Sequence, residues 1–131
     1  MRNTIYRTIA VLLLVLIAFP AQAYNVLHIW NCKMEDGKTM DEVDAVSLAW
    51  LNAAKGMKGG EELTVYIDTP VAANAGDGRF DFVLIAPSFK SWGDFNEGYD
   101  GSAAQKADEA FGDVASCQSS AVWLSRKMGE E

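Results

Sequence analysis

Histidine, cysteine and proline are scarce in this chain of 131 residues, which has one histidine, two cysteines and three prolines. A single histidine cannot build the usual zinc sites without other ligands, and no zinc-type spacing of cysteines is present. Basic residues are also few, because 11 lysines and arginines stand against 18 aspartates and glutamates. An acidic surface repels phosphate backbones and anionic lipid. We therefore predict no metal site and no nucleic-acid partner.

Long apolar runs are missing after residue 23, but the first 23 residues contain one. Two arginines precede the apolar residues 9–19, and residues 21–23 read Ala-Gln-Ala, the small-x-small form that signal peptidase cleaves. We predict a Sec-type signal peptide over residues 1–23, cleaved after Ala23, and one soluble domain over residues 24–131 with no membrane association. Removing Arg2 and Arg7 leaves nine basic residues and a net charge of -9. The predicted location is the periplasm or the extracellular space.

Export changes how the two cysteines are interpreted. In an oxidising compartment a pair of thiols forms a disulfide more often than a redox or metal site. The sequence therefore predicts a disulfide between Cys32 and Cys117.

Apolar periodicity and turn signals predict two helices and four strands. Thr39 with Glu42, and Ser102 with Gln105, have the spacing of capping boxes at helix starts. Alternating or continuous apolar runs mark the strands. Residues 87–101 are predicted to form a structured loop with at most one helical turn. The expected order is strand 24–31, helix 39–56, strand 63–68, strand 80–86, helix 102–116 and strand 118–126.

This order, βαββαβ, predicts an α+β, ferredoxin-like two-layer sandwich with an antiparallel sheet. In that topology the first and last strands are antiparallel neighbours, so Cys32, which ends the first, should face Cys117, which begins the last. Extending this register along both strands predicts the further pairs Leu27–Val122, Ile29–Ser120, Val26–Trp123 and Trp30–Ser119.

The predicted sheet is apolar on both faces. One face, expected to hold the helices, carries Leu27, Ile29, Leu63, Val65, Ile67, Val122 and Leu124. The other carries Val26, His28, Trp30, Tyr66 and Trp123. An uncovered apolar face of this size is rare on monomers, so we predict that a second copy of the sheet covers it in a homodimer. The alternative is that residues 87–101 fold across it.

The element order and the two-sided sheet resemble the dimeric α/β-barrel group of ferredoxin-like proteins, which includes the antibiotic-biosynthesis monooxygenase, EthD-like and NIPSNAP-like families. The resemblance implies a dimeric α/β barrel with a pocket between sheet and helices, which some members use to oxidise aromatic substrates or bind haem. Haem-degrading members place their histidine on a helix. Since His28 lies on the first strand, that activity is not carried over, and no cofactor is expected.

His28 is the first candidate for a base, because imidazole titrates near neutral pH, although a packed structural histidine is the alternative. Aromatic walls with a few carboxylates suit a small apolar or cationic ligand. The structural alternative is that the rings only anchor their loop. The predicted ligand-binding residues are His28, Trp30, Tyr66, Trp92, Phe95 and Tyr99.

Three functions are consistent with these residues. The first is an exported homodimer that binds a small apolar or aromatic ligand. The second is an enzyme of the cofactor-independent monooxygenase type with His28 as base, and the third is a structural module whose outer sheet face binds another protein. A Ser-His-Asp hydrolase is disfavoured because no second histidine or nucleophile elbow is present. Whether the protein is an enzyme stays open.

Overall fold

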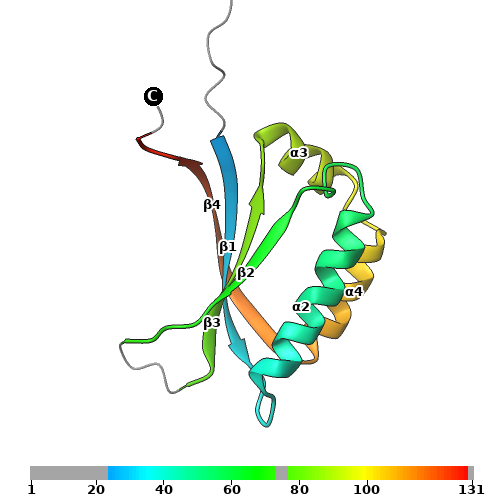
Figure 1. The fold of residues 1–131 in the computed structure, drawn as a ribbon. Helices are drawn as coiled ribbons and strands as arrows, with labels where there is room; N and C mark the ends of the chain where they lie inside the picture. Colours follow the sequence, from blue (N-terminus) through cyan, green and yellow to red (C-terminus); the bar gives the residue numbers. More distant parts are fainter. Residues whose placement is uncertain (1–23, 73–76, 130–131) are drawn as a thin grey trace, which may run out of the picture.

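The computed structural model describes residues 24–72 and 77–129, so the predicted signal peptide lies outside the described residues. Seven elements follow one another along this part of the chain (Figure 1). They are β1 (Tyr24–Met34), α2 (Met40–Lys55), β2 (Thr64–Asp68), β3 (Arg79–Ala86), α3 (Phe89–Glu97), α4 (Ala103–Gly112) and β4 (Ala115–Arg126). None of the helices in these ranges is long and apolar enough to cross a membrane.

The four strands form one antiparallel sheet in the order β2-β3-β1-β4, which confirms the ferredoxin-like α+β fold. β1 and β3 are the central strands, and β4 pairs with β1 along its whole length. All three helices lie on one side of the sheet, and no described segment covers the other side (Figure 1).

Side-chain caps start the helices where the sequence predicts. At α2, the Thr39 hydroxyl accepts a hydrogen bond from the Glu42 amide, and the Glu42 carboxylate accepts one from the Thr39 amide at 2.9 Å. At α4, Ser102 accepts from the Gln105 amide at 3.1 Å. These bonds satisfy amides that have no partner inside the helix.

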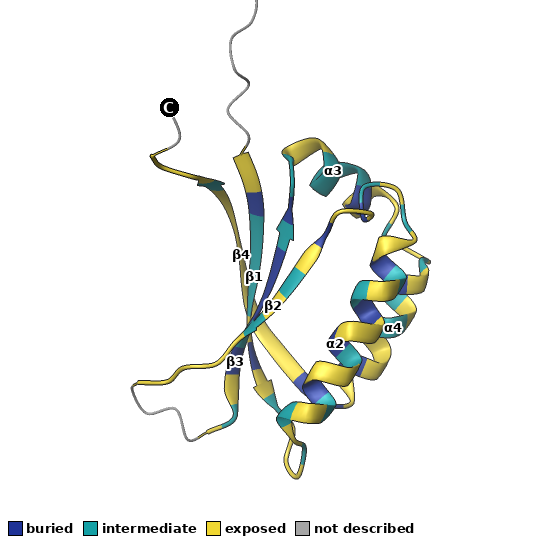
Figure 2. Cartoon of the chain, viewed as in Figure 1, coloured by how far each residue is buried: buried dark blue, intermediate teal, exposed yellow. Residues whose placement is uncertain are grey.

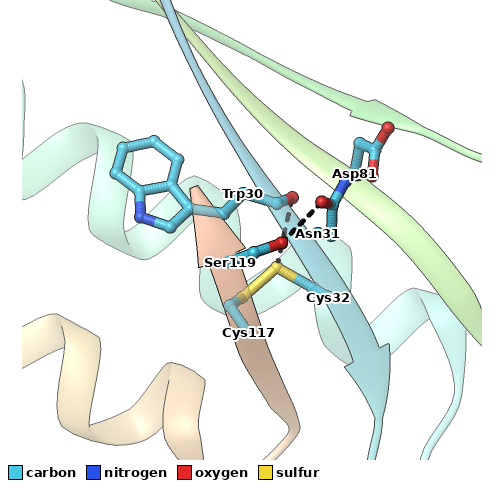
Figure 3. The surroundings of a disulfide bond; sticks show 6 residues. All are labelled: Trp30, Asn31, Cys32, Asp81, Cys117 and Ser119. Carbon is cyan, nitrogen blue, oxygen red and sulfur yellow. Dashed lines mark hydrogen bonds between the residues drawn. A yellow bond between two sulfur atoms is a disulfide. The ribbon is translucent and has the colours of Figure 1, made fainter. Parts of the chain in front are cut away.

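The predicted disulfide is present and joins Cys32 of β1 to Cys117 of β4, directly opposite each other in the sheet (Figure 3). The predicted register holds on one side of the bridge only. On the other side the pairing shifts by one residue, so that Asn31 faces Ser119 and Gln118 is the extra residue of a β-bulge. The four further pairs expected from the sequence are therefore wrong, because a bulge displaces every later pair by one position.

The bulge and the true pairing also correct the predicted faces of β1. Val26, His28 and Trp30 point toward the helices, whereas Leu27 and Ile29 lie on the outer face with Trp123. Alternation places successive residues on opposite faces but does not say which face is buried when both are apolar. The remaining face assignments are correct. They are the inner residues Val65 and Ile67 of β2, Val122 and Leu124 of β4 and Leu63 just before β2, and the outer residues Tyr66 and Trp123.

The core lies between this inner sheet face and the helices. Val26, Phe82 and Leu84 of the central strands pack with Trp50 of α2 and Phe111 of α4. Trp50 and Phe111 each meet the Phe82 ring edge-on, at centroid distances of 5.5 Å. Burial of these rings fixes the distance between the two layers.

The sequence predicted a structured loop over residues 87–101. This prediction is wrong, because most of these residues form the nine-residue helix α3. Ser88 caps it, and Ser91 Oγ donates to the Gly59 carbonyl oxygen at 2.6 Å. Gly59 has a positive φ and lies so close to α3 that a Cβ there would collide with it. α3 lies on the same side of the sheet as the other two helices (Figure 1), so the alternative in which this segment covers the outer sheet face is wrong.

The outer face divides into an apolar half and a polar half. Near the bulge, Asn31 donates to Asp81 at 2.7 Å and accepts from Ser119 at 2.7 Å, which links three strands (Figure 3). Farther along β1, away from the disulfide, the same face is apolar. Its residues are Leu27, Ile29, Tyr66, Val83, Ile85, Ala121 and Trp123, and we call this set the outer apolar patch.

Candidate functional site

A cavity of about 490 Å³ lies between the inner sheet face and the three helices. Six aromatic side chains line it, contributed by two strands, all three helices and the segment between α3 and α4. They are Trp30, Trp50, Phe82, Phe95, Tyr99 and Phe111. A cavity of this volume matches the size range of small-molecule sites, and the walls are of the type that binds apolar or aromatic rings.

His28 lies on the strand wall of this cavity. Its imidazole stacks on Trp30 at a centroid distance of 3.6 Å and meets Trp92 of α3 edge-on at 6.2 Å. Partial burial lowers the pKa of His28 below its usual value of 6.5, because an apolar setting disfavours the charged imidazolium. The imidazole is therefore neutral at pH 7 and can accept a proton or a hydrogen bond.

A second polar group lies on the helix wall. Trp50 Nε1 donates to the Tyr99 hydroxyl at 3.4 Å, and Asp108 of α4 lies near that hydroxyl. Burial, with the adjacent Asp108 carboxylate as charge and hydrogen-bond acceptor, raises the pKa of Tyr99, while the bond from Trp50 lowers it. Tyr99 therefore stays protonated at neutral pH and keeps its hydroxyl as a donor.

Exposed residues mark where the cavity opens. Asn96, Asp108, Gly112, Ser116 and Cys117 line the cavity and are also exposed to solvent. The inner walls are formed by buried rings, among them Trp50, Phe82 and Phe95. A ligand entering here would pass polar groups first and then lie against aromatic surface.

The structure brings four of the six predicted ligand-binding residues together. His28, Trp30, Phe95 and Tyr99 line the cavity. Trp92 lies next to it and contacts His28. Tyr66 is on the opposite face of the sheet and is 56% exposed, so it belongs to the outer apolar patch.

Sequence reasoning missed other lining residues. Trp50 and Phe82 line the cavity but are not among the residues that the sequence predicted to bind a ligand. Asp108, Phe111 and Gly112 follow one another at the spacing of a single helix face, which is a signal that could have found them. The described residues contain no group of three His, Cys, Asp or Glu side chains that could hold a metal ion.

Comparison of the sequence gives no match: no family model matches the chain, and no curated protein matches it either. Solved structures do match. SnoaB, a cofactor-independent oxygenase from Streptomyces nogalater, covers 83% of this chain and 100% of its own, at 11% identity and a TM-score of 0.51.

Two further solved structures match the chain. A putative antibiotic biosynthesis monooxygenase from Caulobacter crescentus covers 82% of this chain and 93% of its own, at 12% identity and a TM-score of 0.53. A dimeric ferredoxin-like protein of unknown function from Thermobifida fusca covers 81% and 93%, at 19% identity and a TM-score of 0.47. The two oxygenase-type structures, with TM-scores above 0.5, show a fold similar to that of the group that the sequence resembles, and at these identities the likeness concerns the fold alone.

Proposed function

We propose that this protein is an exported homodimer that binds a small aromatic molecule in the cavity between its sheet and its helices. The observation that carries this proposal is the cavity of about 490 Å³ with six aromatic side chains in its walls. Rings of this kind gain binding energy from buried area and from ring-to-ring contact, and they need few polar groups to orient a ligand.

Export and dimerisation rest on separate observations. The amino-terminal charge pattern and cleavage motif support a signal peptide, and the Cys32–Cys117 disulfide is compatible with an oxidising compartment. The outer apolar patch supports a sheet-to-sheet homodimer, because Tyr66 and Trp123 remain 56% and 60% exposed in the single chain.

A titration with 1-naphthol tests the binding proposal. Trp30 and Trp50 line the cavity, so their fluorescence should change in a saturable way as the cavity fills. Ala115 also lines the cavity and is 1% exposed, so Ala115→Leu should place extra volume in it and weaken binding about tenfold or more. Ala103→Leu is the matched control, because Ala103 is exposed at the start of α4 and does not line the cavity.

Equal affinity in the wild type and both variants would contradict this proposal, because the compound would then bind elsewhere. Circular dichroism and a thermal melt of each variant establish that the fold is kept. Loss of naphthol binding in Ala115→Leu with a native melt is the expected result.

A second candidate function is oxygenation of a phenol without a cofactor. It is favoured by the placement of a neutral His28 in the wall of the cavity, where the imidazole could take the proton of a phenol. The reaction of 1-naphthol with dioxygen would give 1,4-naphthoquinone and water, so that the substrate supplies the electrons. One oxygen atom enters the ring and the other leaves as water.

His28→Ala separates the two functions. If His28 is the base, quinone formation and oxygen uptake should fall about 100-fold or more while naphthol affinity changes only modestly. Trp92→Phe is a suitable control, because it keeps an aromatic ring beside His28. An absence of oxygen uptake in the wild type would leave binding as the function.

A further inference from the structure

The cavity walls carry charge of one sign only. Among the described residues that line the cavity, Asp108 is the only aspartate or glutamate, and there is no lysine or arginine. Partial burial lowers the pKa of His28, the one histidine there, and so disfavours its charged form. The chain as a whole is also acidic, with a net charge of -7. An anionic ligand would therefore meet no counter-charge in the cavity and would be repelled on approach.

The aromatic walls of the cavity also favour a cationic ligand. The face of an aromatic ring is the negative end of its quadrupole, and indole attracts cations more strongly than the phenyl or phenol ring. Two of the six rings are the indoles of Trp30 and Trp50, one from β1 and one from α2. Aromatic side chains that surround a cavity in this way favour an ammonium group over a neutral group of equal shape.

Asp108 stands at the position where such a cation would also find a full negative charge. It lines the cavity and is exposed at its opening, and it lies near the Tyr99 hydroxyl. The hydroxyl limits the positions of the carboxylate, and exposure keeps the carboxylate hydrated when no ligand is bound. No other described lining residue can supply this charge.

We propose that the cavity selects organic cations: molecules with an ammonium group on an aromatic or apolar body, with the ring against the aromatic walls and the ammonium near Asp108. This inference rests on the proposed binding function and names the charge class of the ligand. The same walls would accept a neutral ring less tightly and would reject a carboxylate or sulfonate.

Three probes with the same phenyl ring test the charge class. They are phenyltrimethylammonium, its neutral isostere tert-butylbenzene, and benzenesulfonate. Titrated into the purified, disulfide-bonded protein, the cation should bind about tenfold or more tightly than the neutral isostere, and the sulfonate should bind too weakly to measure. Tryptophan fluorescence and chemical-shift changes at the cavity residues give the readout.

Two charge-removing variants on α4 separate a local contact from the overall field. Asp108→Asn should weaken the cation about three- to tenfold and leave tert-butylbenzene unchanged. Glu109→Gln is the matched control, because Glu109 is the next residue, is exposed and does not line the cavity. It changes the net charge equally and should leave both affinities unchanged.

The possible failures are distinct. If none of the probes, including 1-naphthol, binds, the proposed binding function itself fails. If tert-butylbenzene binds as tightly as the cation, the cavity binds rings but the cation inference is overturned. If Asp108→Asn and Glu109→Gln weaken the cation equally, the preference comes from the net charge, and the assignment of Asp108 is overturned.

Discussion

His28 can be singled out from the sequence alone, but its environment depends on the fold. As the chain's single histidine, it gives one set of imidazole signals in an NMR spectrum, with no ambiguity of residue assignment. Its stacking on Trp30 and its partial burial depend on β1 presenting this position to the helices. Titratable groups that share the cavity are Tyr99 and Asp108, and the strand residues opposite His28 are Leu84 and Val122, which do not titrate.

The titration of His28 should show a pKa below 6.5, because burial disfavours the imidazolium. The unfolded chain then takes up a proton at higher pH than the folded one. The resulting stability is present above pH 6.5 and is lost as the pH falls from there through the folded pKa. Chemical denaturation of wild type and His28→Gln between pH 8 and 5 measures the difference. A pKa at or above 6.5 would contradict the burial argument.

Helix α2 is an element that local sequence signals are sufficient to locate. Its start depends on two residues three positions apart, Thr39 and Glu42. Their capping hydrogen bonds lie within the helix start itself and need no contact with another element. The helix ends at Lys55, before Gly56. Nothing in this description requires the rest of the fold, which explains why the sequence located this helix correctly.

Loss of the α2 cap should lower the free energy of unfolding by about 1 kcal/mol in Thr39→Ala. The amide of Glu42 then loses its side-chain acceptor. Urea denaturation provides the measurement, and Thr69→Ala is the control, because Thr69 is an exposed threonine outside any helix or strand. Equal midpoints for the two variants would show that the capping box contributes no net stability.

Strand β4 depends on more distant contacts. Val122, Trp123 and Leu124 are 46–63% exposed, although they lie on both faces of the strand. β4 therefore gains little from side-chain burial over its second half. Its attachment relies on the backbone ladder with β1 and on the Cys32–Cys117 bridge beside the bulge.

Removal of the bridge in a Cys32→Ala, Cys117→Ala double variant should destabilise the protein by about 4 to 5 kcal/mol in the chain-entropy model, since the cysteines are 85 residues apart in sequence. Guanidinium denaturation measures the loss. Wild-type protein treated with a thiol reductant should lose the same amount, which distinguishes the cross-link from the side-chain change. An unchanged midpoint on reduction would show that β1 and β4 do not depend on the bridge.

At the scale of the whole molecule, the main feature is the sheet face that no described element covers (Figure 1). Helices cover one face of the sheet, and most of β4 at its edge is exposed (Figure 2). The outer apolar patch lies on the other face. A self-complementary contact between two such patches is the simplest way to bury them, and it follows two-fold symmetry. A different protein with an apolar face is the remaining alternative.

Trp123→Lys should convert the proposed homodimer to a monomer at micromolar concentration, because it would place a charge in the apolar interface that the proposal requires. Leu48→Lys is the matched control: Leu48 on α2 is 59% exposed, against 60% for Trp123, but lies away from the sheet. Sedimentation equilibrium measures the mass. A monomeric wild type at these concentrations would contradict the homodimer and favour a partner of another kind.

The sequence by itself determined the features that arise from neighbours along the chain. The helix caps and the approximate strand positions are examples, and the fold class and the cysteine pairing followed from their order. Thr39 and Ser102 needed only residues three positions away. Cys32 and Cys117 could be paired because each stands at the end of a strand that the topology places next to the other.

Only the tertiary structure decided which face of β1 is buried, where the bulge lies and which side chains enclose the cavity. Gln118 carries no local mark of a bulge, and both faces of β1 are apolar, so alternation had two solutions. Asp108, Phe111 and Trp50 line the same cavity as His28 only after the helices dock on the sheet. Contacts of this kind depend on the distance and register between layers, which the balance of packing over the whole core sets.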